Sequence, residues 1–111
     1  MENVIYNELC SRGYLVDVGM IESRELVNGK QEYRQYEVDF IVTDGMRKYY
    51  IQSAYSIPDE EKMNQELKSF RKIDDSFQKI AIVGEDIATY TNDDGIIFMG
   101  LMQFLESEVI L

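Results

Sequence analysis

The first apolar pattern along the chain has the period of a helix. Met1, Ile5 and Leu9 recur every fourth residue, and Gly13 follows where a left-handed cap would end a helix. Residues at this spacing lie on one side of an α-helix and form the stripe that it buries. The pattern therefore predicts a helix over residues 2–12. Because this helix would open with no capping segment before it, we also expect the chain to be excised from a longer protein.

The next part of the chain has the alternation of strands, interrupted by two turn signals. Residues 14–21 are apolar and β-branched, Asn28-Gly29 is a strong signal for a two-residue hairpin, and residues 33–42 resume the strand pattern. Asp44-Gly45 then gives a second hairpin into residues 47–56. Three consecutive antiparallel strands are predicted.

A second helix is predicted after the hairpins. Residues 56–59 form a capping box with the only proline in the first turn, and a narrow apolar stripe carries the helix to Ile73. The elements predicted after it are a central strand at residues 79–84, a loop at 89–95, a short strand at 96–99 and a closing helix at 101–106. The order α-β-β-β-α-β-β-α indicates a single domain over residues 1–111, of the α/β or, more closely, α+β class.

Strand pairing places the polar residues of the second hairpin on one face. With Asp44-Gly45 as a tight turn, Asp39 should pair with Tyr50 and Glu37 with Gln52. Period-two alternation then separates two faces. The apolar face, which must meet the core, holds Val38, Phe40, Val42, Tyr49 and Ile51, and the other holds Glu37, Asp39, Lys48, Tyr50, Gln52 and Ala54. An antiparallel sheet with one solvated face would show the same pattern without any site.

Composition removes several kinds of chemistry. The chain contains no histidine, which excludes the usual zinc hydrolases and Ser-His-Asp or Cys-His catalysis. Its net charge of −10 repels a phosphate backbone, so a nucleic-acid partner would need a local basic patch or a bridging metal. A single cysteine, Cys10, and the lack of an apolar run of about 20 residues predict a reduced, cytoplasmic protein without a membrane span.

Carboxylates remain as the candidate catalytic or metal-binding groups. Glu8 on the first helix, Asp39 on one strand and Gln52 on the next would form an oxygen-ligand set suited to Mg²⁺. A metal-assisted phosphodiester hydrolase also uses a lysine to stabilise developing charge, but the position two residues after Gln52 is Ala54. Glu8 equally fits a glutamate that flanks a buried stripe and reaches solvent.

Other lysines are candidates for the missing cation. Lys48 shares the polar face but lies six residues before Ala54, roughly 20 Å along a strand. Lys62, Lys68 and Lys72 belong to the second predicted helix, and they would supply the charge only if the fold directs one of them toward the strands.

Several segments in fixed order carry a resemblance to a known family. They are Glu2-Asn3 with Tyr6-Asn7-Glu8-Leu9, Arg12-Gly13-Tyr14, Glu37-Val38-Asp39-Phe40, Tyr50-Ile51-Gln52-Ser53-Ala54-Tyr55, Glu66-Leu67 with Ile73-Asp74-Asp75, Gly95-Ile96-Ile97 and Gln103-Phe104-Leu105. In these the chain resembles the PD-(D/E)xK, restriction-endonuclease-like fold, and within it a domain of unknown function at the C-terminus of bacterial and archaeal AAA-type ATPases.

The resemblance implies a mixed central sheet flanked by helices. It places Glu8, Asp39 and Gln52 at the helix-carboxylate, strand-aspartate and Glu/Gln positions of the nuclease motif, with Ala54 in place of the motif lysine. It also implies an N-terminal ATPase module attached in the longer protein, since this chain has no G-x-x-x-x-G-K-[ST] motif.

Three functions fit these observations. The first is a non-catalytic accessory, regulatory or partner-binding domain of a P-loop ATPase. The alternative is a Mg²⁺-dependent nuclease acting on DNA or RNA, with Glu8, Asp39, Gln52 and Glu37 at the metal and a relocated lysine. The third is a protein-binding domain that uses the hairpin tyrosines, which are Tyr33, Tyr36, Tyr49, Tyr50 and Tyr55.

Overall fold

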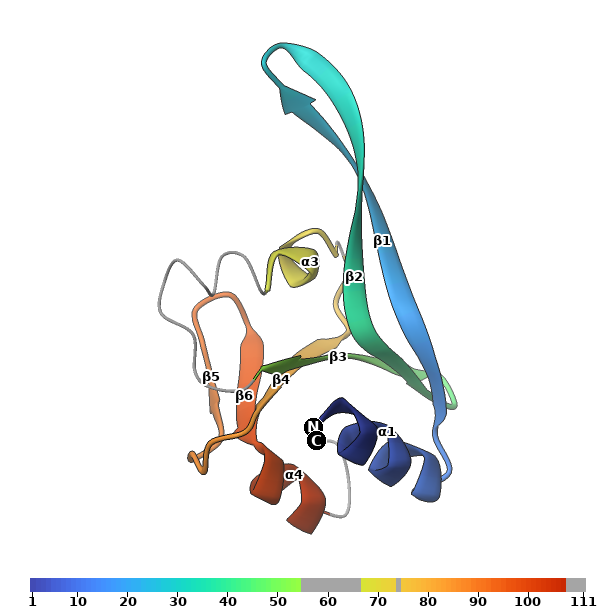
Figure 1. Cartoon of the computed structure of the whole chain (residues 1–111), viewed down its shortest axis with the longest axis vertical. Helices are drawn as coiled ribbons and strands as arrows, with labels where there is room; N and C mark the ends of the chain where they lie inside the picture. The colour runs from blue at the N-terminus through green and yellow to red at the C-terminus, as the bar shows by residue number, and fades with distance from the viewer. Residues whose placement is uncertain (55–66, 74, 108–111) are drawn as a thin grey trace.

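The chain folds around one mixed sheet with short helices on both of its faces (Figure 1). The computed structural model describes residues 1–54, 67–73 and 75–107. The described elements are α1 (Glu2–Ser11), β1 (Leu15–Val27), β2 (Lys30–Asp44), β3 (Arg47–Ala54), α3 (Lys68–Arg71), β4 (Gln78–Val83), β5 (Tyr90–Thr91), β6 (Ile96–Gly100) and α4 (Leu101–Glu106). The predicted α+β class is confirmed, and the order of elements matches with one strand added.

The six strands lie in the order β1-β2-β3-β4-β6-β5. β3, β4 and β6 run parallel to one another, and the remaining neighbours are antiparallel. β5 is the added strand, and it lies inside the segment predicted as a loop. Its two residues pair with β6, and the ring of Tyr90 stacks on Phe98 with the centroids 5.1 Å apart. Two residues are too few to show an alternating pattern, so hydrophobic periodicity could not predict this strand.

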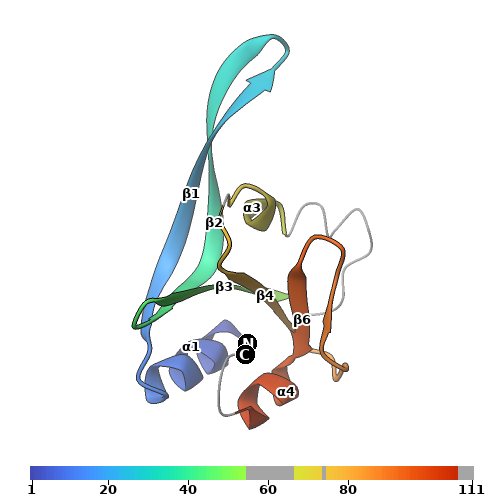
Figure 2. The ribbon, with the colours of Figure 1, turned by 180° about the vertical axis from the view of Figure 1, so that it is seen from behind.

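One face of the sheet, which we call the α1 face, is covered by α1 and α4 (Figures 1 and 2). Ile5 and Leu9 are fully buried there, as the helical pattern predicts. Gly13 has φ +86° and its N–H donates to the carbonyl of Cys10 at 3.0 Å, so the predicted cap of α1 is confirmed. The strand residues of this core are Phe40, Val42, Tyr49, Ile51, Ile80, Ile82 and Met99.

The opposite face, which we call the α3 face, is also covered. Leu67 and Phe70 pack there against Tyr50 and Ala54, which are only 6% and 9% exposed. The prediction that the face of Tyr50 and Ala54 is the polar one is therefore wrong for these two residues. Such an alternation is typical of a sheet with one covered face, whereas parallel strands are covered on both sides. The start of the predicted second helix, at residues 56–59, lies outside the described residues.

The register of the second hairpin differs from the prediction. Asp44 pairs with Arg47 and Phe40 with Ile51, so the turn residues are Gly45 and Met46, one position later than predicted. Gly45 has φ +62°, a conformation that favours glycine. The change moves the turn by one residue along both strands, so residues paired across the two strands still share the predicted faces, except next to a bulge in β2.

A β-bulge in β2 moves Val38 to the α3 face. The pairing with β1 changes from Asp17–Ile41 to Gly19–Val38, which leaves an extra residue on β2. A Cβ atom at Gly19 would lie 2.6 Å from the side chain of Ile41, so a larger residue there would force Ile41 to move. Val38 consequently packs with Tyr50, and the predicted common face of Val38 and Phe40 is wrong.

Beyond the bulge, β1 and β2 continue as a two-stranded hairpin that projects from the sheet (Figures 1 and 2). We call residues 20–37 the arm. Its turn is the predicted Asn28-Gly29, with φ values of 52° and 78° that are typical of a type I′ turn. The strands extend well beyond the predicted residues 14–21 and 33–42, because the turn closes the ladder up to Val27 and Lys30. The arm lengthens the molecule to 48 Å and raises its radius of gyration to 14.4 Å, against about 13 Å for a compact chain of this length.

Candidate functional site

Asp39 and Gln52 meet at the point where β2 separates from β3. The side-chain oxygen of Gln52 accepts a hydrogen bond from the backbone N–H of Asp39 at 3.0 Å. In return, the Asp39 carboxylate accepts from the backbone N–H of Ser53 at 2.9 Å and from its hydroxyl at 2.8 Å. Asp39 and Gln52 thus lie side by side, but the Asp39 carboxylate lies with Ser53, whose side chain is on the other side of β3 from that of Gln52. The predicted common face of Asp39 and Gln52 is therefore wrong.

The topology explains why these bonds form here. Ladder pairing between β2 and β3 ends at Phe40 and Ile51, while β3 continues beside β4 up to Ala54. Backbone N–H groups next to such a split lose their strand partners, and an unpaired group away from water is costly. The side chains of Gln52 and Asp39 supply the missing acceptors, each for the opposite strand. Both motif residues therefore have a structural role that needs no ligand.

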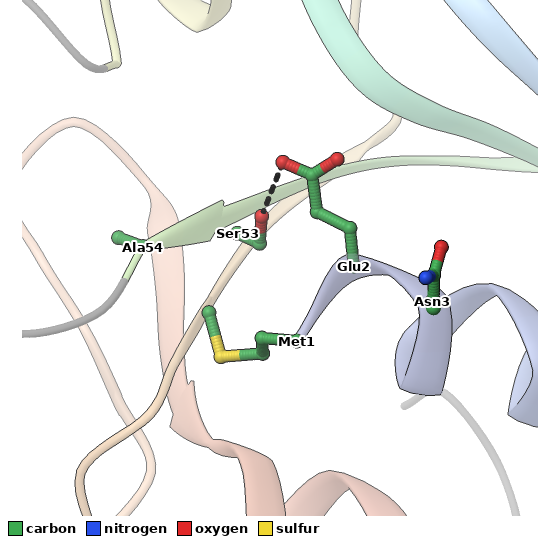
Figure 3. A pocket seen from close by; sticks show the side chains of 5 residues that line it. All are labelled: Met1, Glu2, Asn3, Ser53 and Ala54. Carbon is green, nitrogen blue, oxygen red and sulfur yellow. Dashed lines mark hydrogen bonds between the residues drawn. The ribbon is translucent and has the colours of Figure 1, made fainter.

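The hydroxyl of Ser53 also lies 3.4 Å from a carboxylate oxygen of Glu2. Figure 3 shows the Glu2 side chain reaching from α1 toward Ser53 at the edge of a pocket of about 370 Å³, which is lined by Met1, Glu2, Asn3, Ser53 and Ala54. A hydroxyl donates only one proton, and the shorter contact assigns it to Asp39. The nearest oxygens of the Asp39 and Glu2 carboxylates thus lie at most about 6 Å apart, on either side of the Ser53 hydroxyl.

Glu8 does not join this group. Its carboxylate forms an ion pair with Arg12 at 3.1 Å, and Arg12 in turn donates to the carbonyl of Phe104 at 2.8 Å and lies over that ring. Glu8 therefore anchors the arginine that joins α1 to α4. Glu2 and Glu8 flank the buried stripe of α1 on opposite sides, about 9 Å apart along the helix axis, so only one of them can reach β3.

Sequence reasoning missed Glu2 and Ser53. The spacing of the buried stripe allowed either flanking glutamate to face the strands, and nothing in the pattern distinguished them. Ser53 could have been found from the split itself, because a hydroxyl beside an unpaired strand end is a natural hydrogen-bond donor to a neighbouring carboxylate. The separation of β2 from β3 depends on the bulge in β2, and no turn residue in the sequence predicts that bulge.

Position 54, where the nuclease motif has its lysine, faces away from the Asp39 carboxylate. Ala54 packs into the core of the α3 face, whereas Ser53, the partner of that carboxylate, faces Glu2 on α1. Alternation along β3 puts Gln52 on the same side as Ala54. Ala54 lines the pocket, but its side chain packs in the α3 core and not beside the Asp39 carboxylate.

The other candidate lysines that the structure describes are engaged elsewhere. Lys48 lies 5.9 Å from the centre of the Phe77 ring, Lys68 lies 5.5 Å from that of Tyr36, and Lys72 pairs with Glu25 at 3.0 Å. Lys62 lies outside the described residues. Within residues 1–54, 67–73 and 75–107, no group of three or more Asp, Glu or Cys side chains is placed to hold a metal ion.

The hairpin tyrosines are divided between core and surface. Tyr49 and Tyr50 are buried, and the hydroxyl of Tyr50 donates to Asp75 at 2.6 Å. Burial, together with that hydrogen bond, raises the pKa of Tyr50 to about 12. Tyr33 is exposed on the arm and Tyr36 is half-buried, while Tyr55 lies outside the described residues. A binding surface made of all five tyrosines is therefore excluded by the burial of two of them.

Comparison with known proteins gives a distant similarity to one longer protein. No family profile matches the sequence. The chain is 33% identical over 85 residues to an uncharacterized protein of Haemophilus influenzae. The match spans 77% of this chain but only 18% of that relative, which is therefore several times longer. No helix in the described part of the chain is both long and apolar enough to cross a membrane.

Proposed function

We propose that the chain is a restriction-endonuclease-like domain that has lost hydrolytic activity and serves an attached P-loop ATPase as an accessory, regulatory or partner-binding module. The reciprocal hydrogen bonding of Asp39 with Gln52 and Ser53 carries this proposal. In a nuclease the side chains at these motif positions would bind a metal. Here they accept hydrogen bonds from backbone N–H groups where β2 and β3 separate.

The surroundings of these residues support the same function. Ala54 is buried on the side of the sheet away from the Asp39 carboxylate, and the three described candidate lysines contact Phe77, Tyr36 and Glu25. A net charge of −10 opposes the approach of a phosphate backbone. The α-β-β-β-α-β order with parallel β3 and β4 agrees with a nuclease-derived core.

A cleavage assay tests the loss of hydrolysis. The chain is incubated with Mg²⁺ or Mn²⁺ and with single- and double-stranded DNA and RNA, and we expect no product above buffer. Asp39→Asn and, as a matched control, the exposed Asp44→Asn are assayed in parallel. Metal-dependent cutting that Asp39→Asn abolishes and Asp44→Asn retains would establish a nuclease and overturn the proposal.

The attachment to an ATPase is tested on the longer relative. The Haemophilus influenzae protein has most of its length outside the matched 85 residues, which leaves room for a P-loop module. We expect the purified full-length relative to hydrolyse ATP, and deletion of the matched segment to change the rate without abolishing it. A full-length protein that neither binds nor hydrolyses ATP would contradict this part of the proposal.

A further inference from the structure

β1 forms an edge of the sheet, and its outer side is open. β2 pairs with one side of β1, and no strand among the residues that the structure describes pairs with the other. An edge of this kind presents backbone N–H and C=O groups that can pair with another strand. Both ribbon views show the arm portion of β1 standing out from the rest of the sheet (Figures 1 and 2).

The exposed side chains of this edge strand follow a self-complementary order. Met20, Glu22, Arg24 and Leu26 alternate along β1 and so share one face of the arm. Met20 and Leu26 are 50% and 76% exposed, although both are apolar. The order is apolar, acidic, basic, apolar. A second copy running in the opposite direction therefore presents a matching partner to every one of these residues.

The match specifies one register. With Ser23 opposite Ser23 of a second copy, Met20 faces Leu26 and Glu22 faces Arg24, and symmetry makes each pair occur twice. Moving the two-fold axis by one residue places either Glu22 opposite Glu22 or Arg24 opposite Arg24. Like charges directly opposite each other destabilise a strand pair, so the neighbouring registers are disfavoured.

The charged groups are free to make these pairs. Arg24 forms no ion pair within the described part of the chain, unlike Arg34, which pairs with Glu32 on the same arm. Glu22 accepts a hydrogen bond from Tyr33 through one carboxylate oxygen, which leaves the other for a partner. Charges on an edge strand usually prevent pairing, but here their order favours pairing with a second copy of the same strand.

We propose that the chain self-associates as a two-fold symmetric dimer in which the outer edges of two β1 strands pair antiparallel about Ser23. The arms lie side by side and the two sheets become one. The contact is confined to the arm, so it belongs to the small and reversible class of interfaces that bury less than about 1,200 Å².

Charge reversal tests the register. Sedimentation of the wild-type chain from about 10 µM to about 1 mM should show a concentration-dependent dimer, as expected for a weak interface. Arg24→Glu or Glu22→Arg should raise the dimer Kd about tenfold or more, since each creates two like-charge pairs. The double variant Glu22→Arg/Arg24→Glu should restore a Kd within about threefold of wild type, because it re-forms both pairs in reverse.

The control is Arg34→Glu, which makes the same change of charge on β2 and should leave the Kd unchanged. Circular dichroism establishes that each variant is folded. A wild-type chain that stays monomeric over this range would overturn the proposal. So would a double variant as weak as the single ones, or an equal effect of Arg34→Glu.

A cross-link tests the symmetry axis independently. Ser23→Cys is made in a Cys10→Ser background, and mild oxidation should give a disulfide-linked dimer, because residues opposite each other in an antiparallel pair have Cα atoms about 4.5–5.5 Å apart. Gln35→Cys in the same background is the matched control on β2 and should stay monomeric. Equal cross-linking of the two variants would indicate random collision and contradict the proposed axis.

Discussion

The side chains of Gln52 and Asp39 have the oxygen atoms that a metal site would use. Their hydrogen bonds in the fold account for both residues without a metal. Each supplies a side-chain oxygen to a backbone N–H of the opposite strand, at 3.0 and 2.9 Å. The free energy at stake is that of a backbone donor left without an acceptor, about 1–3 kcal/mol. A metal ion that bound these side chains would have to break the hydrogen bonds that they make to the two backbone N–H groups.

Gln52→Leu tests this role. The substitution keeps the size of the side chain and removes the acceptor of the Asp39 N–H, so the free energy of unfolding measured by urea denaturation should fall by about 1–3 kcal/mol. Gln35→Leu, at an exposed position of the arm, should change it by no more than about 0.5 kcal/mol. Equal stabilities of Gln52→Leu and wild type would show that the bond is dispensable.

Tyr50 gives a prediction on pH. Its pKa in the folded chain is about 12, and that of an unfolded tyrosine is about 10. The folded state therefore holds the proton more tightly, and this contribution to stability is complete below pH about 10 and is lost as the pH rises toward about 12. Across that window the free energy of unfolding of wild type should fall more steeply than that of Tyr50→Phe. Tyr90→Phe, on the exposed β5, should follow wild type, and a Tyr50→Phe curve parallel to wild type would contradict the assignment.

Among the elements, the arm depends most on local turn chemistry. Below the bulge the strands have core residues on both faces, whereas the arm is held by its own ladder and by a few contacts with α3, including Lys72–Glu25 at 3.0 Å. Its type I′ turn is therefore a large part of what keeps the strands paired. The arm should be the part of the sheet that opens most readily.

Gly29→Ala tests the turn. Gly29 has φ +78°, and a Cβ atom there would meet nothing within 4 Å, so the cost of alanine is conformational alone, about 1–2 kcal/mol. Amide hydrogen exchange in the arm should accelerate by about 5- to 30-fold, while β4 and β6 keep their protection. Gln31→Ala is the neighbouring control and should leave exchange unchanged. Faster exchange throughout the sheet would show that the arm does not open on its own.

At the scale of the whole molecule, the sequence predicted the elements better than their assembly. Apolar periodicity located α1, and Asn28-Gly29 located the arm turn, because both are signals between residues close in the chain. Tyr50 and Ala54 were assigned to a polar face because their burial depends on α3, an element distant in sequence. The bulge in β2 opposite Gly19 was equally hidden, since the close approach of Ile41 to Gly19 arises only when the two strands pair.

For the candidate site too, the sequence predicted some of the residues but not how they are arranged. Asp39 and Gln52 were found because neighbouring strands bring them together in either register. Glu8 was predicted as the helix carboxylate, whereas Glu2, on the other flank of the stripe, is the one that faces β3, and only the packing of α1 against β3 selects between the two flanks. Sequence periodicity defines which side of a helix is buried, but it does not define what each flank faces.

The bulge in β2 has a consequence for cooperativity. Val38 and Phe40 are two residues apart on one strand, yet they belong to hydrophobic cores on opposite sides of the sheet. Detachment of β2 from the sheet would remove a buried side chain from both cores at once. We therefore expect the two layers of the molecule to unfold as a single cooperative unit, although each is small enough to be marginally stable alone.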